Sequence, residues 1–222
     1  IIDVGPLMAE QPGALESTAE AIMGASQGLG FYYIRNHAVT TEIREQAFAA
    51  SRAFFLGSVE AKRAIATNDI NRGWMGIGEA LMTGATRTDL KELFSWGLEL
   101  GPDDPEVQAG TPFRGPNQWP QSSPTMRSAI YDGFYAAGCR TGAALLRAVC
   151  VGLGLKPDAL ASCFEKPMAR GQLIYYPPQP ADMGEEQFGV SAHTDFGCLT
   201  MVCQDDLGGL LVRTRDGEWL AV

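Results

Sequence analysis

The stretch Phe188-Gly-Val-Ser-Ala-His-Thr-Asp-Phe-Gly197 decides the expected fold and chemistry, because it sets His193 and Asp195 two residues apart. Side chains alternate between the two faces of a strand, so residues i and i+2 share a face. If this stretch is extended, we expect His193 and Asp195 to point inward together. One imidazole nitrogen and one carboxylate oxygen suit a 2-His-1-carboxylate site for ferrous iron. Zinc, manganese and nickel bind the same atoms, so the ligand types alone do not select iron.

Short apolar segments separated by turn residues flank this pair. Upstream, an apolar run from Gln172 ends at the Pro177-Pro178 pair. Downstream, the Gly208-Gly209 and Asp216-Gly217 pairs interrupt further apolar segments, and Asp-Gly is a strong hairpin signal. We therefore expect short strands on both sides of the pair, within the segments 172–176, 190–195, 198–206, 207–213 and 215–220.

Residues 171–222 resemble the first part of the catalytic core in the isopenicillin N synthase-like family of iron(II)/2-oxoglutarate-dependent oxygenases. The resemblance rests on four motifs in the family's order and spacing: Tyr-Pro-Pro at 176–178, Ala-His-Thr-Asp at 192–195, Gln-Asp-Asp-Leu-Gly-Gly-Leu at 204–210 and Asp-Gly-Glu-Trp at 216–219. It implies an α+β fold with a double-stranded β-helix (jelly-roll) core and flanking N-terminal helices. It also implies Fe(II) as the cofactor, with 2-oxoglutarate and O2 as co-substrates.

Earlier segments resemble the family's N-terminal region, namely Ile2-Asp-Val4, Gly30-Phe-Tyr-Tyr-Ile-Arg-Asn-His-Ala38 and Phe113-Arg-Gly-Pro-Asn-Gln-Trp-Pro120. The 222 residues, 45% of them hydrophobic, suffice for one substantial core. We expect a single domain over 1–222. Residues 1–165 would be mostly helical with early strands, and residues 171–222 would begin the jelly roll.

Periodicity and turn residues predict the remaining elements. Helical patterns run over 14–26, from Thr40 or Thr41 to Phe55, and over 123–155. The apolar run 31–34 predicts a strand. Segments 68–84 and 100–122 are rich in Gly, Pro, Asn and Asp, so we expect loops there.

The chain begins at Ile1 without an initiator Met and ends at Val222 inside an expected strand. A jelly roll stopped there would expose its inner face and its ladder groups, so we expect the polypeptide to continue and the C-terminal part of the core to be missing from this chain. The resemblance places in that part the distal histidine ligand and an Arg-x-Ser that holds 2-oxoglutarate. The only other histidine, His37, is expected to be a hydrogen-bonded turn residue and not the third ligand.

Composition limits the partners and the compartment. A formal net charge of −9 argues against nucleic-acid binding, which needs a basic surface, and favours a small-molecule substrate. The five cysteines form no Cys-x-x-Cys pair, which predicts buried or semi-buried thiols and a reducing cytoplasm. No apolar run is long enough to span a bilayer, so we expect no membrane partner. The sequence does not indicate an oligomeric state.

The resemblance also suggests residues for the co-substrate and the substrate. Tyr176 matches the tyrosine that hydrogen-bonds the 2-oxoglutarate carboxylate, and the alternative is a core aromatic. Arg72 and Trp74 resemble a segment over the pocket mouth, where an arginine meets an anionic substrate group. Their alternative is a solvated loop arginine beside a packing tryptophan. Phe196 is expected to line the pocket or to pack inside the barrel. In the family-like stretch 89–96, we expect structural roles for Lys91 and Glu92.

Three functions remain open. The first is a 2-oxoglutarate-dependent oxygenase that hydroxylates or desaturates a small molecule. The second is an oxidase of the isopenicillin N synthase kind, which binds iron but does not use 2-oxoglutarate. The third is a metal-free jelly-roll binding protein. Several motifs in register favour the first.

Overall fold

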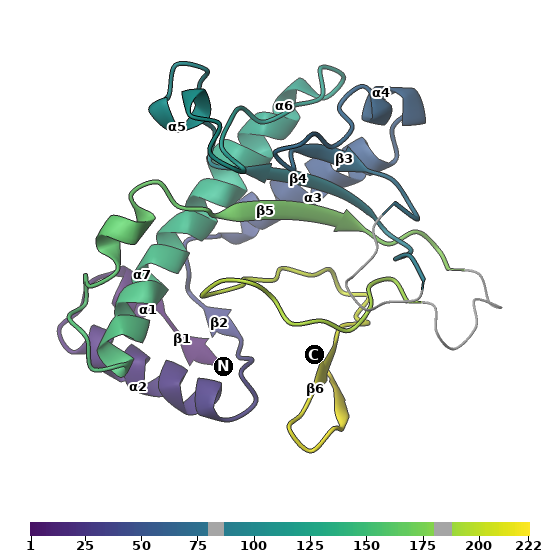
Figure 1. Cartoon of the computed structure of the whole chain (residues 1–222). Coiled ribbons are helices and arrows are strands. Elements are labelled where there is room, and N and C mark those ends of the chain that lie inside the picture. Colours follow the sequence, from purple (N-terminus) through teal and green to yellow (C-terminus); the bar gives the residue numbers. More distant parts are fainter. Residues whose placement is uncertain (80–86, 180–187) are drawn as a thin grey trace. The chain divides into compact units, whose positions relative to one another are not determined.

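The computed structural model describes residues 1–79, 87–179 and 188–222, which divide into two compact units (Figure 1). The terminal unit comprises residues 1–40, 137–162 and 196–222, and the sheet unit comprises residues 41–136 and 163–195. The expected single domain stays a prediction.

The sheet unit is built on a three-stranded antiparallel sheet in the order β3 (Gly73–Met75), β4 (Glu92–Gly97), β5 (Arg170–Tyr175). All six residues of β4 are buried, and β5 pairs with β4 along its whole length (Figure 1). β5 confirms the strand expected at the start of the catalytic core. β3 corrects the loop expected over 68–84, because the ladder to β4 holds the backbone of Gly73–Met75 extended. Residues 80–84 lie outside the described part.

Helices cover this sheet with aromatic side chains. α3 (Thr41–Phe55) confirms the predicted helix and packs against α6 (Pro124–Arg127) and η1 (Ser128–Tyr135). Phe54 of α3 meets Phe94 of β4 with ring centroids 5.2 Å apart. The short helices α4 (Val59–Arg63) and α5 (Pro105–Gln108) complete the unit, and α5 lies within the loop expected over 100–122. The core of this unit consists of Ala47, Phe54, Phe55, Trp74, Phe94, Trp96, Met126 and Ile130.

The long helix expected over 123–155 is observed as three consecutive pieces, α6, the π-helical η1, and α7 (Ala136–Gly152). It ends before Leu155 because Gly154 adopts a left-handed backbone with φ 74° and Leu155 N–H returns to the Cys150 carbonyl. In the part of the chain that the structure describes, no helix has the length and apolar character needed to cross a membrane.

In the terminal unit, β1 (Ile2–Asp3) runs parallel to β2 (Ile34–Arg35), and α1 (Gly5–Met8) and α2 (Ala14–Gln27) lie between them in sequence. α2 confirms the predicted helix. β2 corrects the strand expected over 31–34, because the parallel pairing with β1 begins only at Ile34. The core of this unit comprises Val4, Leu7, Ala19, Ile22, Leu145 and Ala148.

Near the end of the chain, β6 (Leu211–Arg213) and β7 (Trp219–Ala221) form the hairpin that Asp216-Gly217 predicted, with Gly217 at φ 90°. The strands expected over 190–195 and 198–206 are not observed. A strand needs a partner for its backbone groups, and within the described residues no ladder forms along these two segments. Helices and sheets together agree with the expected α+β class.

The cysteine prediction was only partly right. Cys150 is buried and Cys139 is partly buried, but Cys163, Cys198 and Cys203 are exposed. Cys163 lies on the short 3-10 helix η2 (Ala161–Phe164), which has no buried residue. Cys198 and Cys203 lie in the segment that forms no described ladder, so sheet packing does not cover them.

Thr141 ties α7 to the turn that contains His37. Its side chain is 1% exposed, donates to the Ala137 carbonyl at 3.0 Å and accepts from the Ala38 N–H at 3.2 Å. We expect Thr141→Val to lower the free energy of unfolding by about 1–2 kcal/mol, because valine keeps the shape but leaves the Ala38 N–H without this acceptor. Urea denaturation measures the change. Thr141→Ser, which keeps the hydroxyl, should lose less, and an equal loss in both variants would contradict this account.

Candidate metal centre

His193 and Asp195 lie next to each other, but they lie in no described strand and both are exposed, so the inward-facing pair that was expected on a strand is not observed. Nε2 of His193 is 3.2 Å from Oδ1 of Asp195. The side chains are 36% and 49% exposed, so a metal ion has access to both atoms. The structure shows one nitrogen donor next to one oxygen donor. Metal binding by this pair stays a prediction.

A hydrogen bond within the same segment orients the His193 ring. Nδ1 lies 2.8 Å from the Ser191 carbonyl oxygen, which only accepts hydrogen bonds, so Nδ1 donates. In the neutral imidazole, the lone pair then belongs to Nε2, the nitrogen that faces Asp195. Histidine ligands in metal sites are commonly fixed by such a bond from the second ring nitrogen. The pair therefore fits a divalent metal in donor type and in orientation.

A third protein donor is not found next to this pair in residues 1–79, 87–179 and 188–222, where no three His, Cys, Asp or Glu side chains cluster as metal ligands do. His37 is the hydrogen-bonded turn residue that was expected. Its Nδ1 accepts from the Val39 N–H at 3.2 Å, beside Asn36 at φ 59°.

The segment before β4 holds residues 188–195, called here the ligand segment, through Asp89 and Leu90. Oδ1 of Asp89 accepts from the Ser191 N–H at 3.0 Å and from the Ser191 hydroxyl at 3.2 Å. The backbone N–H of Leu90 donates to the Phe188 carbonyl at 3.1 Å. Neither Asp89 nor Ser191 was predicted to have a role at the site. The only available signal was an acidic residue two positions before Lys91 in a family-like stretch.

Tyr176 lies against the same segment. Its ring packs so closely on Gly189 that a Cβ at that position would lie 2.8 Å from Cδ1 of the ring. Burial, and secondarily the negative charge of Asp89, raise the pKa of the Tyr176 phenol above its ordinary value of 10.0. A phenol is already protonated at neutral pH, and the shift acts in the same direction, so the hydroxyl can donate a hydrogen bond to a carboxylate. Its role with 2-oxoglutarate stays a prediction.

Arg72 and Trp74 lie in the interior of the sheet unit. Arg72 is 4% exposed, and its guanidinium donates to the carbonyls of Ile70 at 3.1 Å and Phe113 at 2.9 Å. This corrects the alternative of a solvated loop arginine, because those backbone carbonyls replace water around it. Burial, then the positive charge of Arg170, lower the pKa of Arg72 from its ordinary value. Trp74 packs in the core, as expected in the alternative of a packing tryptophan.

The substrate roles of Arg72, Trp74 and Phe196 stay predictions. The side chain of Phe196 is fully exposed, so in the described residues it neither lines a pocket nor packs inside a barrel.

Lys91 and Glu92 have the structural roles expected of them. Glu92 accepts from the Lys62 ammonium at 2.7 Å and from Nε1 of Trp74 at 2.8 Å. Lys91 pairs with Oδ2 of Asp89 at 2.9 Å. All of these charged side chains are buried, so each charge is neutralised by its partner and not by water.

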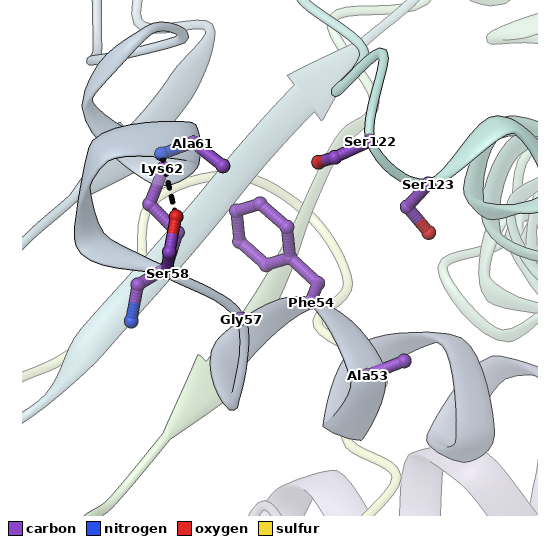
Figure 2. A pocket seen from close by; sticks show the side chains of 8 residues that line it. All are labelled: Ala53, Phe54, Gly57, Ser58, Ala61, Lys62, Ser122 and Ser123. Atoms are coloured by element: carbon purple, nitrogen blue, oxygen red, sulfur yellow. Dashed lines mark hydrogen bonds between the residues drawn. The ribbon is translucent and has the colours of Figure 1, made fainter.

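A pocket of about 220 Å³ lies elsewhere in the sheet unit, between the end of α3, α4 and the residues before α6 (Figure 2). Ser58 there accepts from the Ala61 N–H at 3.2 Å. The Lys62 ammonium is bound by Glu92 and by the Phe55 carbonyl. The pocket contains none of the predicted site residues, so it is not a candidate for the metal centre. Its lining consists of Ala53, Phe54, Gly57, Ser58, Ala61, Lys62, Ser122 and Ser123.

Two family models match the chain. Residues 1–122 match the model described as "non-haem dioxygenase in morphine synthesis N-terminal", and residues 170–222 match the 2OG-Fe(II) oxygenase superfamily. The second match contains the predicted metal ligands.

Relatives of known name match the whole chain. It is 29% identical to the 2-oxoglutarate-Fe(II) type oxidoreductase hxnY of Emericella nidulans, and the match covers 100% of the chain and 65% of the relative. It is 30% identical to the 2-oxoglutarate-dependent dioxygenase citB of Monascus ruber, with 100% and 69% covered. The chain thus spans about two thirds of the length of these relatives.

A solved structure shares the fold. A full-length protein of Neurospora crassa, determined in complex with alpha-KG and thymine, superimposes with a TM-score of 0.82 at 26% sequence identity. The match covers 99% of this chain and 69% of that one. The fold of this chain is therefore similar to that of a protein whose structure contains a bound 2-oxo acid.

Proposed function

Because the chain belongs to the 2OG-Fe(II) oxygenase superfamily, we propose that the full-length protein is an iron(II)- and 2-oxoglutarate-dependent oxygenase that hydroxylates or desaturates a small molecule. The observation that carries the proposal is the meeting of His193 Nε2 and Asp195 Oδ1 at 3.2 Å, with the other ring nitrogen held by the Ser191 carbonyl. The expected cytoplasmic location belongs to the same proposal.

In this function, His193 and Asp195 would hold Fe(II), and the metal, with 2-oxoglutarate and O2, would supply the oxidising power. Decarboxylation of 2-oxoglutarate to succinate and carbon dioxide would supply two of the four electrons that reduce O2, and the substrate would supply the other two. In a hydroxylation, one oxygen atom enters succinate and the other enters the product.

Residues of this chain bind 2-oxoglutarate and the substrate and orient the metal ligand. The Ser191 carbonyl keeps a proton on Nδ1 of His193, and so directs the Nε2 lone pair to the metal. The phenol of Tyr176, protonated at neutral pH, would donate to a carboxylate of 2-oxoglutarate. Arg72, Trp74 and Phe196 are the predicted substrate residues. Because Arg72 and Trp74 are buried, we propose that these two influence the substrate site only indirectly. The distal histidine, the Arg-x-Ser and the closing strands of the jelly roll are predictions for the full-length protein.

An anaerobic titration of the purified full-length protein with Fe(II), followed by 2-oxoglutarate, tests the function. We expect the visible charge-transfer band of a chelated 2-oxo acid after the second addition. Iron binding without that band would instead indicate an oxidase that does not use 2-oxoglutarate. The absence of iron binding would contradict both enzyme functions and leave the metal-free binding protein.

The same titration tests the role of Tyr176. We expect Tyr176→Phe to weaken 2-oxoglutarate binding by about 10-fold or more, because a hydrogen bond to a charged group contributes about 1.5–3 kcal/mol. Iron affinity should not change. The control is Tyr175→Phe, since the neighbouring ring points into the core and stacks on Phe55 at 5.5 Å. Equal effects in both variants would contradict a specific role for the Tyr176 hydroxyl.

A further inference from the structure

A buried ion pair between Asp89 and Lys91, which is not part of the ligand segment, holds that segment through Ser191. Asp89 and Lys91 are 1% and 7% exposed, and Nζ of Lys91 lies 2.9 Å from Oδ2 of Asp89. One carboxylate oxygen of Asp89 faces the Lys91 ammonium, and the other accepts both hydrogen bonds from Ser191. The pair therefore presents a fixed acceptor to the ligand segment.

A continuous path of contacts leads from this pair to the predicted metal ligand. Ser191 donates to Asp89 through its N–H and its hydroxyl, and its carbonyl accepts from Nδ1 of His193. The two bonds to Asp89 hold the N–H and the side chain of Ser191 and so limit the positions open to its carbonyl, which lies in the next peptide unit. The position of that carbonyl in turn sets the rotation of the imidazole. The segment itself lies in no described ladder, so these bonds and the Leu90 contact replace sheet pairing.

We propose that Asp89 is a positioning residue for the metal site, which acts through Ser191 to aim Nε2 of His193, and that the ion pair with Lys91 holds the Asp89 carboxylate in place. The inference rests on the proposed function, because it concerns how the predicted ligand pair is oriented. Outer residues that orient histidine ligands commonly change metal affinity by about 10–100-fold when they are replaced.

The test compares two buried ion pairs with different neighbours. Asp89→Leu/Lys91→Met removes the acceptor and both charges, so no unpaired charge stays buried. Lys62→Met/Glu92→Leu makes the same kind of change in the second pair, which contacts Trp74 and the Phe55 carbonyl. A third variant, Asp89→Asn/Lys91→Met, also removes both charges but keeps an oxygen acceptor for Ser191. The probe is Co²⁺, which binds the same donor types as Fe(II) and is stable in air.

Visible absorption titrations of the full-length variants measure Co²⁺ affinity, and urea denaturation without metal measures folding. We expect the Asp89→Leu double variant to bind Co²⁺ about 10–100-fold more weakly than wild type. The Asp89→Asn double variant should recover most of that loss, and the Lys62/Glu92 variant should bind as wild type does.

Wild-type affinity in the Asp89→Leu double variant would overturn the inference, and so would an equal loss in the Lys62/Glu92 variant. A wild-type protein that binds neither Co²⁺ nor Fe(II) would overturn the proposed function itself, and this inference with it.

Discussion

Replacing His193 with alanine is expected to weaken Fe(II) binding by more than about 100-fold and to abolish 2-oxoglutarate turnover. The variant removes the nitrogen donor itself, whereas the loss of a residue that only orients a ligand changes metal affinity by about 10–100-fold. The side chain is 36% exposed, so we expect folding without metal to change little. Anaerobic Fe(II) titration of the full-length variant measures the affinity.

Thermal unfolding gives an independent readout of the same change. A metal that binds only the folded state stabilises it, by about 2.7 kcal/mol at a free concentration 100 times the Kd. Added Fe(II) should therefore raise the unfolding temperature of wild type and leave that of His193→Ala unchanged. The chain's other histidine supplies the control, since His37 is bonded within its own turn and His37→Ala should keep the metal response. A wild-type response in His193→Ala would refute the ligand assignment.

The second large effect concerns stability. Glu92→Leu is expected to lower the free energy of unfolding by about 3–5 kcal/mol, because it leaves the buried Lys62 ammonium without its carboxylate. Lys62 is 4% exposed and 2.7 Å from Glu92 in the wild-type protein. Chemical denaturation of the metal-free protein measures the loss.

Replacing both partners separates the cost of the unpaired charge from the loss of packing. Lys62→Met/Glu92→Leu should recover most of the stability, because apolar replacement of a whole buried ion pair is often neutral or stabilising. Nε1 of Trp74 would still lose its acceptor, so full recovery is not expected. A double variant as unstable as Glu92→Leu would show that packing, and not the unpaired ammonium, dominates.

Local patterns in the sequence predicted the elements whose signals are local. α2, α3 and the long helix after Ser123 follow apolar periodicity, and the β6–β7 hairpin follows its Asp-Gly turn. The i, i+2 spacing placed His193 beside Asp195 even though the segment forms no described ladder.

The environment of β4 was not predictable in this way. Its first residue is a glutamate, and that charge is buried only because Lys62, 30 positions earlier, and Trp74 pair with it. Arg72 was expected either at a pocket mouth or in solvent. It lies instead inside the sheet unit, where the carbonyl of Phe113, 41 positions later, accepts a hydrogen bond from it. A single sequence contains no record of which distant segment will neutralise a buried charge.

The contact between Asp89 and Ser191 also constrains the order of folding, since it joins residues 102 positions apart. Closing a free loop of that length costs on the order of 4 kcal/mol in chain entropy. The β4–β5 ladder brings Glu92 next to Tyr175 and shortens the remaining loop to the stretch between Tyr175 and Ser191. We infer that the ligand segment docks after this ladder has formed. The ladder joins residues no later than Tyr175, so the sheet forms before His193 and Asp195 are in place, and its folding does not depend on these two residues.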